Sequence, residues 1–258
     1  MVTSAHTVLS FSGAYAETGL PFMEGEPLID CSDIGGTVCY CDGEAEAEIL
    51  SRIVTRPVEG IHWIDSGDYH HVSALWMSMV QSPFDLLLLD NHPDMQEPAF
   101  GGILSCGGWV RTALERYPLL EEVVIAGIDP SLQSECEGFG ERVKVFDRDQ
   151  LKCHDSKVIP ALLSERSLPL YISLDKDVLT RDYARTDWDQ GNMTLEYLLE
   201  SLQGVFSTRK VIGVDICGEI PSHKGGTPSD FSVNASTDRI LQEFFVKELE
   251  KNRNRFDK

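Results

Sequence analysis

The sequence predicts an α/β protein whose core is a parallel sheet connected by crossover helices. Short runs of apolar and β-branched residues alternate with helical patterns along the chain. The run Phe84–Leu89 is apolar without alternation apart from Asp85, as expected of a central strand that is covered on both faces. No internal repeat, low-complexity segment or Pro/Ser linker interrupts this order, so residues 1–258 are predicted to form one domain.

The individual elements follow from this alternation in chain order. Strands are placed on the short apolar or β-branched runs Thr7–Phe11, Gly36–Tyr40, Ile61–Ile64, Phe84–Leu89, Glu122–Ala126, Val143–Phe146, Leu170–Leu174 and Val211–Ile216. Helices are placed on the helical patterns between them, at Glu44–Thr55, His71–Gln81, Gly107–Arg116, Ser156–Ser164, Thr194–Phe206 and Ser236–Lys251. The terminal residues Asn252–Lys258 are expected to be frayed.

Composition and charge exclude several classes of function. A chain of 258 residues with 42% hydrophobic residues is long enough to bury one sizeable core. The 22 Lys and Arg against 42 Asp and Glu give a formal net charge of −20, which disfavours binding to nucleic acid or to an anionic membrane surface. The same carboxylates are compatible with metal sites or with a cationic small-molecule substrate.

The cysteines and the N-terminal segment bear on the cellular compartment. The seven cysteines are scattered and form no Cys-x-x-Cys pair, so they resemble neither a disulfide framework nor a zinc clip. The N-terminus lacks the basic and apolar regions of a signal peptide, and no apolar stretch has the length of a membrane span. A reducing cytoplasm is the predicted location.

Two acidic motifs follow apolar strands, where the chemistry of parallel sheets collects. The first is Asp90-Asn91-His92-Pro93-Asp94, and the second is Ser173-Leu174-Asp175-Lys176-Asp177. Alternate residues of an extended segment point the same way, so the carboxylates and the imidazole within each motif can converge. Such a cluster would repel itself unless cations neutralised it, and this donor set suits Mn²⁺, with Zn²⁺, Fe²⁺ or Co²⁺ as competitors. The alternative is that each acidic pair caps a helix or solvates a loop.

A third polar cluster, Asp65-Ser66-Gly67-Asp68-Tyr69-His70-His71, also follows a strand and opens a helix. One of its histidines could complete a metal shell. A lone histidine of this kind is otherwise a buried or capping side chain, but the two neighbouring acidic motifs favour the metal interpretation.

Together these motifs resemble the arginase, agmatinase and formiminoglutamase group, the ureohydrolase superfamily. That group has a Gly-Gly-Asp-His-Ser stretch, then Asp-Ala-His-x-Asp, then Ser-x-Asp-x-Asp, and the order and approximate spacing match over residues 61–219. The resemblance implies a three-layer αβα sandwich with a parallel sheet of about eight strands. It also implies a binuclear Mn²⁺ centre with a bridging water or hydroxide, and a homo-oligomer such as the trimers or hexamers common in the group. The implied metal ligands are Asp90, His92, Asp94, Asp175, Asp177 and either His70 or His71.

Within this resemblance, Asp90 and Asp175 would bridge the metals. His70 is the preferred histidine ligand because Val72 and Ser73 then fall where the family has an apolar and a small residue, although Tyr69 is an insertion. His71 would then be a proton relay, or it would contact the metal ligands without binding the metal itself.

Further residues have implied roles in catalysis and substrate binding. Asp94 would collect the proton of the nucleophile, and His71 or Cys106 would return one to the leaving amine. Cys106 stands where the family places a shuttle histidine; the alternative is a buried cysteine at a tight glycine turn. Glu219 would recognise a cationic substrate, or it is an ordinary loop residue. The divergent loop after Asp177, including Arg181 and Trp188, would also bind the substrate and contribute to its recognition.

The leading hypothesis is therefore a divergent metal-dependent hydrolase that cleaves a C–N bond in a guanidino, amidino or related small substrate. One alternative is a zinc-dependent deacetylase-like amidohydrolase, because His70-His71 also resembles the Gly-Gly-Leu-His-His stretch of those enzymes, which share the fold. A second is a binding or regulatory protein that keeps the metal and has lost catalysis, suggested by the missing shuttle histidine and the divergent loop.

Overall fold

A computed structural model describes residues 6–18, 28–98, 101–151 and 155–257 of the chain. Within these ranges an eight-stranded sheet has the strand order β2-β1-β4-β10-β9-β5-β7-β8, and all of its neighbouring strands are parallel. The strands are β1 (His6–Ser10), β2 (Leu28–Asp30), β4 (Ile61–Ile64), β5 (Phe84–Leu89), β7 (Leu120–Ile128), β8 (Val143–Asp147), β9 (Leu170–Asp175) and β10 (Val211–Cys217). A separate antiparallel pair joins β3 (Tyr40–Cys41) to β6 (Leu104–Ser105).

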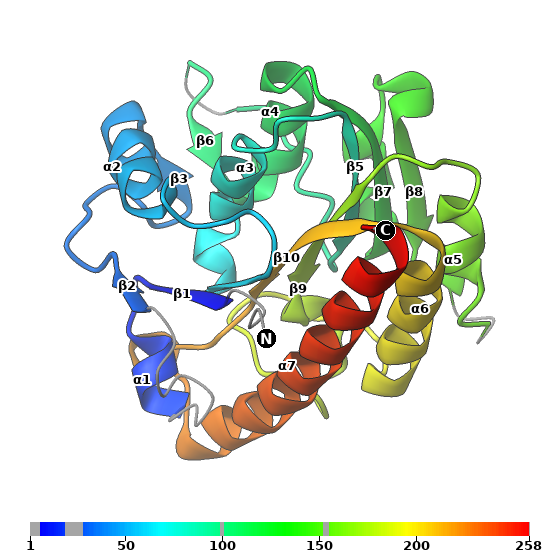
Figure 1. Cartoon of the computed structure of the whole chain (residues 1–258). Coiled ribbons are helices and arrows are strands. Elements are labelled where there is room, and N and C mark those ends of the chain that lie inside the picture. Colours follow the sequence, from blue (N-terminus) through cyan, green and yellow to red (C-terminus); the bar gives the residue numbers. More distant parts are fainter. Residues whose placement is uncertain (1–5, 19–27, 99–100, 152–154, 258) are drawn as a thin grey trace.

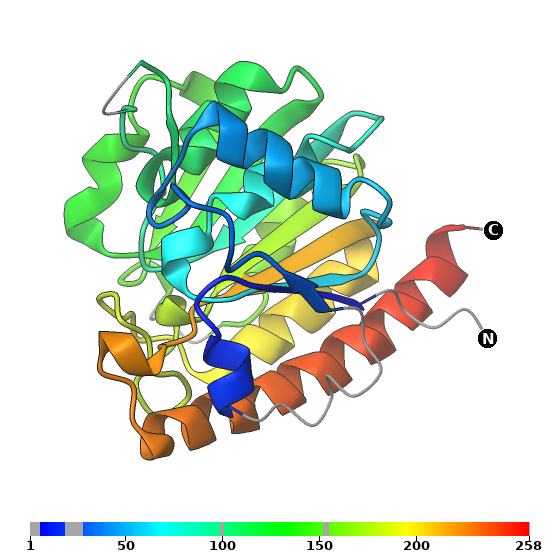
Figure 2. The same cartoon turned by 90° about the vertical axis from the view of Figure 1, so that its left-hand side faces the viewer.

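Helices cover both faces of the sheet, as Figures 1 and 2 show. The helices are α1 (Ala14–Thr18), α2 (Gly43–Ile53), α3 (Val72–Met77), α4 (Trp109–Arg116), α5 (Val158–Leu163), α6 (Leu195–Thr208) and α7 (Pro228–Phe256). α2, α3 and α4 pack on one face, and α1, α5, α6 and α7 pack on the other. The predicted three-layer αβα sandwich with a parallel sheet is confirmed.

The central strand β5 shows why the sheet needs two helical layers. All six of its residues are buried. Leu86 and Leu88 belong to the core beneath α2–α4, whereas Leu87 and Leu89 belong to the core beneath α5–α7. Because successive side chains of a strand point to opposite faces, a continuous run of leucines requires apolar cover on both sides.

The predicted strand at Gly36–Tyr40 is wrong. Only Tyr40 of that segment is in a strand, and that strand pairs with β6 outside the main sheet. The edge position next to β1 is taken by the short strand β2, which the sequence pattern missed together with α1. The segment turns instead of extending, since Gly36 and Cys39 both have left-handed backbone angles, with φ of 72° and 59°.

The expected fraying after Asn252 is also wrong up to residue 257; Lys258 lies outside the described residues. α7 starts at Pro228, earlier than the predicted Ser236, behind a capping box formed by Thr227 and Asp230, and it continues to Phe256. Asn252 is 3% exposed, and its amide donates hydrogen bonds of 2.7 Å to the carbonyls of Phe206 and Arg209. Tertiary hydrogen bonds therefore hold the last turns of the helix.

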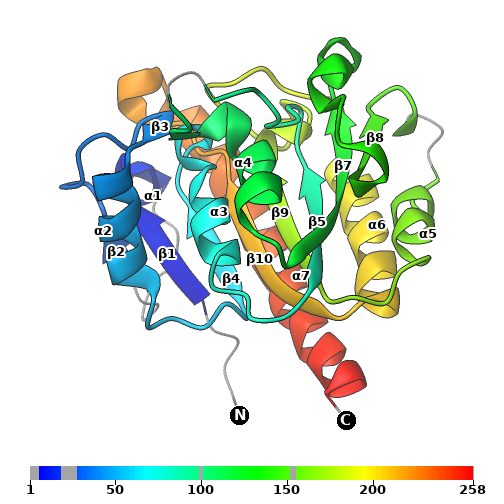
Figure 3. The same ribbon diagram turned by 90° about the horizontal axis from the view of Figure 1, so that it is seen from above.

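The strand order brings the polar motifs to one edge of the sheet. β4, β10, β9 and β5 are consecutive neighbours, and all four run in the same direction. Figure 3 shows them from above, with α3 lying across the near face. The residues that leave their carboxyl ends therefore meet in one place. Among the described residues, no helix has both the length and the apolar character needed to cross a membrane.

Candidate metal centre

Four carboxylates and two imidazoles meet at the carboxyl ends of these strands. Asp90, Asp94, Asp175 and Asp177 are at most 6% exposed. His70 comes from the turn after β4, and His92 comes from the loop after β5. Three overlapping groups of side chains have ligand atoms close enough to hold a metal ion: His70 with Asp90 and Asp94, Asp90 with His92 and Asp177, and His70 with Asp175 and Cys217.

His70 directs its Nδ1 atom toward three of the carboxylates. This nitrogen lies 3.0 Å from Asp94 Oδ2, 3.2 Å from Asp90 Oδ2 and 3.7 Å from Asp175 Oδ2. The other ring nitrogen, Nε2, lies 2.8 Å from Ser173 Oγ, a residue of β9. A proton on Nε2 directed to this hydroxyl leaves the Nδ1 lone pair facing the carboxylates, as a metal ligand requires.

His92 forms the second half of the cluster. Its Nδ1 atom lies 2.8 Å from Asp177 Oδ2 and 3.4 Å from Asp90 Oδ1. Asp90 therefore turns one oxygen to each histidine, Oδ2 to His70 and Oδ1 to His92. A carboxylate that directs one oxygen toward each histidine is suited to bridge two cations.

Local backbone geometry aims these side chains. Asp94 follows Pro93 with a left-handed φ of 51°, which turns its carboxylate back toward His70. The indole N–H of Trp109 on α4 donates a hydrogen bond of 2.6 Å to Asp94 Oδ2. Asp175 and Asp177 both face the cluster, whereas Lys176 between them contacts Glu219 and Asp238.

Burial and neighbouring charges shift the pKa values of the clustered side chains. Burial, followed by the charge of Asp90, raises the pKa of Asp94 to about 7. Burial, followed by the charge of Asp175, raises the pKa of Asp177 well above its usual range. His92 is affected in the opposite sense: burial lowers its pKa, but hydrogen bonds to Asp177 and Asp90 outweigh burial and raise it to about 12. The cluster therefore favours bound positive charge.

A cavity of about 280 Å³ opens onto the cluster. All four aspartates and both histidines line it, together with Cys39, Gln96, Cys106, Glu135 and Trp188. No Lys or Arg of the described residues is among its lining side chains. The negative charge of the aspartates is thus not balanced by a described lysine or arginine in the cavity, and the volume of the cavity suits a small molecule.

Two predicted substrate-binding residues do not reach this cavity. Glu219 is fully buried, its carboxylate contacts Lys176, and Asn234 donates a hydrogen bond of 3.0 Å to its Oε2. Arg181 is exposed and contacts Gln190. The geometry gives no support to substrate binding by either residue. Glu219 is held away from the cavity because the buried ammonium of Lys176 needs a counter-charge.

Of the remaining predicted residues, Trp188 and Cys106 line the cavity, and His71 does not. Trp188 lies on the cavity wall, with its ring centroid 5.7 Å from that of His92. Cys106 also lines the cavity, and contact with the thiol of Cys39, together with burial, raises its pKa far above the usual value. His71 is fully buried and does not line the cavity, and burial and the neighbouring His70 lower its pKa to about 3. The structure therefore favours His70 over His71 as the histidine that faces the cluster, and it gives no support to a proton relay through His71.

Two residues that border the cluster were not predicted from the sequence. Glu135 lies in the turn Pro130–Cys136 after β7, far from the three motifs in the sequence. Cys217 is the last residue of β10 and is paired in register with Asp175. Its position at a strand end was a usable signal, but its proximity to Asp175 depends on the strand order.

Comparison with known proteins gives consistent results. A model of the Arginase family matches residues 60–229. An uncharacterized protein from Thermotoga maritima is 32% identical over 160 residues, which are 62% of this chain, and the chain spans 58% of that relative's length.

Two solved structures have the same fold. Agmatine ureohydrolase of Thermoplasma volcanium has a TM-score of 0.70 at 15% identity, over 98% of this chain and 92% of that chain. Proclavaminate amidino hydrolase from Streptomyces clavuligerus has a TM-score of 0.68 at 16% identity, over 95% of this chain and 92% of that chain. At these identities the likeness concerns the fold, whereas the family model covers most of the chain and includes every motif of the cluster. The chain belongs to the arginase family.

Proposed function

We propose that the chain is a hydrolase that uses two divalent metal ions to cleave a C–N bond in a small guanidino or amidino substrate. The observation that carries the proposal is the pair of histidine-carboxylate groups that share Asp90 and border one cavity. Membership of the arginase family and the structural likeness to an agmatine ureohydrolase and an amidino hydrolase support the same chemistry.

The donor set fits divalent cations. One ion would be held by His70, Asp90, Asp94 and Asp175, and the other by His92, Asp90, Asp175 and Asp177. Four buried carboxylates in a cavity with no described lysine or arginine are stabilised as anions by bound positive charge. Imidazole and carboxylate ligands suit Mn²⁺, Zn²⁺, Fe²⁺ and Co²⁺, and we propose Mn²⁺ as the metal on the family resemblance.

Bound cations at such a site activate water for attack at neutral pH and stabilise developing negative charge. The side chains have separate tasks. Asp94 lines the cavity and can accept the proton of the attacking water. Cys106 lines the cavity as well and is the proposed donor of a proton to the leaving amine. Its raised pKa makes the thiol a weak acid without metal, so this role requires the bound cations to lower that pKa.

Substrate recognition is proposed for Glu135. One of its carboxylate oxygens, Oε2, is buried without a hydrogen-bond partner, and the residue lines the cavity. The four aspartates of the cavity are committed to the metals, so Glu135 is the lining carboxylate that remains for a cationic substrate group. Trp188 would bound the same space. A homo-oligomer and a cytoplasmic location stay predictions.

Metal content and turnover test the proposal together. Protein purified without chelator and dialysed against Mn²⁺ is expected to bind about two ions per chain by elemental analysis. It should release urea or an equivalent C–N cleavage product from a panel of guanidino and amidino compounds, and dialysis against a chelator should abolish this turnover.

The other outcomes separate the alternatives. About one Zn²⁺ per chain with hydrolysis of acylated amines would favour a deacetylase-like enzyme. Two metal ions with no turnover on any panel, but with specific ligand binding, would favour a binding or regulatory protein. Absence of metal under every condition would refute the proposal.

Changing Glu135 to Gln tests the substrate site. The substitution keeps the shape and removes the charge, so KM for cationic substrates is expected to rise about tenfold or more, with little change in kcat. The matched control is Glu137→Gln, which removes the same charge from an exposed residue that directly follows the turn Pro130–Cys136 and does not line the cavity. Steady-state kinetics on both variants give the comparison. An equal KM for Glu135→Gln, Glu137→Gln and the wild type would exclude Glu135 from substrate recognition.

A further inference from the structure

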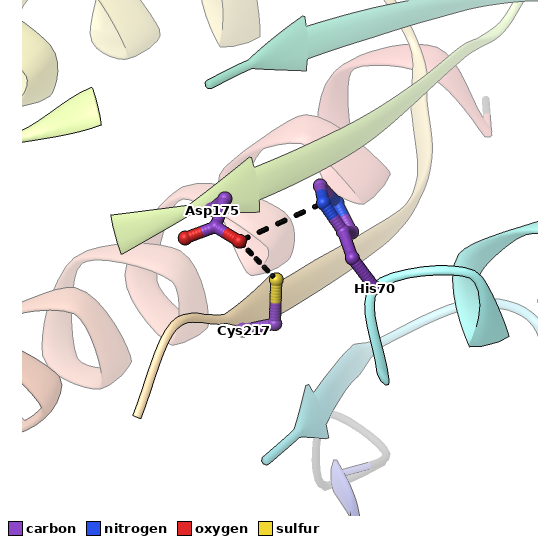
Figure 4. A group of neighbouring side chains, drawn as sticks. All are labelled: His70, Asp175 and Cys217. Atoms are coloured by element: carbon purple, nitrogen blue, oxygen red, sulfur yellow. Dashed lines mark hydrogen bonds and ion pairs between the residues drawn. The ribbon is translucent and has the colours of Figure 1, made fainter. Parts of the chain in front are cut away.

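Cys217 borders the proposed metal centre from a strand that contributes none of the family's implied ligands. It is the last residue of β10 and lies directly beside Asp175, the last residue of β9, in the parallel register. Its side chain is 1% exposed, and its Sγ atom lies 3.1 Å from Asp175 Oδ2. Figure 4 shows the thiol, the carboxylate and the His70 ring directed toward one another.

The spacing of these donors suits a single ion. One ligand atom each from His70, Asp175 and Cys217 lies within 4.8 Å of the others. Two ligands of one ion with bonds of about 2.0–2.3 Å lie about 3–4 Å apart in tetrahedral or cis-octahedral geometry. Asp175 Oδ2 lies 3.1 Å from Cys217 Sγ and 3.7 Å from His70 Nδ1, which agrees with this spacing. His70 Nδ1, which faces Asp90 and Asp94, is also the nitrogen that lies 3.7 Å from Asp175 Oδ2, so the thiol lies beside the ion that His70 would hold.

The other described cysteines lack this arrangement. Cys39 and Cys106 line the cavity but belong to none of the ligand groups. Cys31, Cys41 and Cys136 likewise belong to none of them. Within the described part of the chain, Cys217 is thus the thiol that shares a histidine and an aspartate with the centre.

We propose that Cys217 Sγ is a direct ligand of the metal ion held by His70, which makes this half of the centre a sulfur-containing site. The inference rests on the proposed metal centre and deepens it. In the binding step the S–H bond breaks, a metal–sulfur bond forms, and the proton passes to solvent. A thiolate ligand favours Zn²⁺, Co²⁺ or Fe²⁺ over Mn²⁺ at this position, so the proposal of Mn²⁺ is then restricted to the half of the centre that His92 would hold.

Cobalt spectroscopy tests the ligation directly. Full-length protein loaded with Co²⁺ is expected to show a sulfur-to-cobalt charge-transfer band in the near ultraviolet, in addition to the visible ligand-field bands. The variant Cys217→Ser should lose the charge-transfer band and keep the ligand-field bands. Cys106→Ser, which removes a thiol from the same cavity, is the matched control and should keep both sets of bands.

A second readout uses metal preference. Removal of the thiol is expected to weaken Zn²⁺ binding relative to Mn²⁺ binding by about tenfold or more in competition titrations. If Cys217→Ser does not fold, the wild type is compared with Cys39→Ser and Cys106→Ser, both of which should keep the charge-transfer band because neither of these cavity thiols is the proposed ligand. Bound Co²⁺ without a charge-transfer band, or a band that persists in Cys217→Ser, would overturn the ligation and leave the metal centre intact. Failure of the wild type to bind Co²⁺, Zn²⁺ or Mn²⁺ would overturn both proposals.

Discussion

Replacing Asp90 or Asp175 by alanine is expected to abolish tight binding at the metal centre and to reduce turnover by about a hundredfold or more. Asp90 turns one oxygen to each histidine of the cluster, and Asp175 lies at the junction of its two halves, next to both His70 and Asp177. Removal of a shared carboxylate leaves each half short of a ligand. Elemental analysis should therefore show a fall from about two ions per chain to about one or fewer.

The control for this experiment is Asp147→Asn. Asp147 is also a buried aspartate at the carboxyl end of a strand, but it belongs to β8 at the far edge of the sheet, where its carboxylate accepts hydrogen bonds from the backbone of Asp149 and Gln150. This variant should retain both metals. Unchanged metal stoichiometry in both Asp90→Ala and Asp175→Ala would refute the assignment of the bridging ligands.

Replacing Lys176 by methionine is expected to lower the free energy of unfolding of the metal-free protein by about 3–5 kcal/mol. Lys176 is fully buried, contacts Glu219, and lies 2.6 Å from Asp238 Oδ1. Methionine fills most of the same volume but leaves these buried carboxylates without their cation. Urea-induced unfolding at pH 7 in the presence of a chelator measures the effect without a contribution from bound metal.

The pH for this measurement follows from the sign of the pKa shift. Burial lowers the pKa of Lys176, but the charges of Asp238 and Glu219 outweigh burial and raise it above the ordinary value. The stabilisation is therefore fully present below the ordinary lysine pKa of about 10.4 and is lost only as the pH rises through the raised value.

A surface ion pair provides the comparison. Lys210 lies 2.6 Å from Asp257 Oδ1, and their side chains are 42% and 43% exposed. Lys210→Met should lower the free energy of unfolding by less than about 1 kcal/mol, because solvent screens an exposed pair. Equal losses in Lys176→Met and Lys210→Met would show that the buried lysine contributes no more than a surface one, and would remove the structural explanation for the position of Glu219.

Much of the fold could be predicted because its central strands are mostly apolar. Ile61–Ile64 and Phe84–Leu89 have the predicted bounds, and their burial on both faces is what an apolar run without alternation indicates. The three-residue β2 lacked such a signal because Leu28 and Asp30 are exposed and only Ile29 is buried. Its hydrogen bonds to β1, which no local pattern encodes, make it a strand.

The sequence by itself determined the composition of the site. Asp90, His92 and Asp94, and likewise Asp175 and Asp177, lie close together because each set falls within five residues at one strand end. The extended backbone expected from the sequence is not what orients them, since Asp94 has a left-handed φ of 51° and Asp177 lies in a 3-10 helix. The order of these motifs at strand ends was enough to predict one acidic cluster.

Only the tertiary structure decided which neighbours that cluster has. Strand order set Cys217 beside Asp175, and the turn after β7 brought Glu135 to the cavity wall. Glu219 forms an ion pair with the buried Lys176 and does not line the cavity. These outcomes depend on contacts between residues distant in sequence, and on the free energy of pairing buried charges, neither of which the spacing of residues along the chain records.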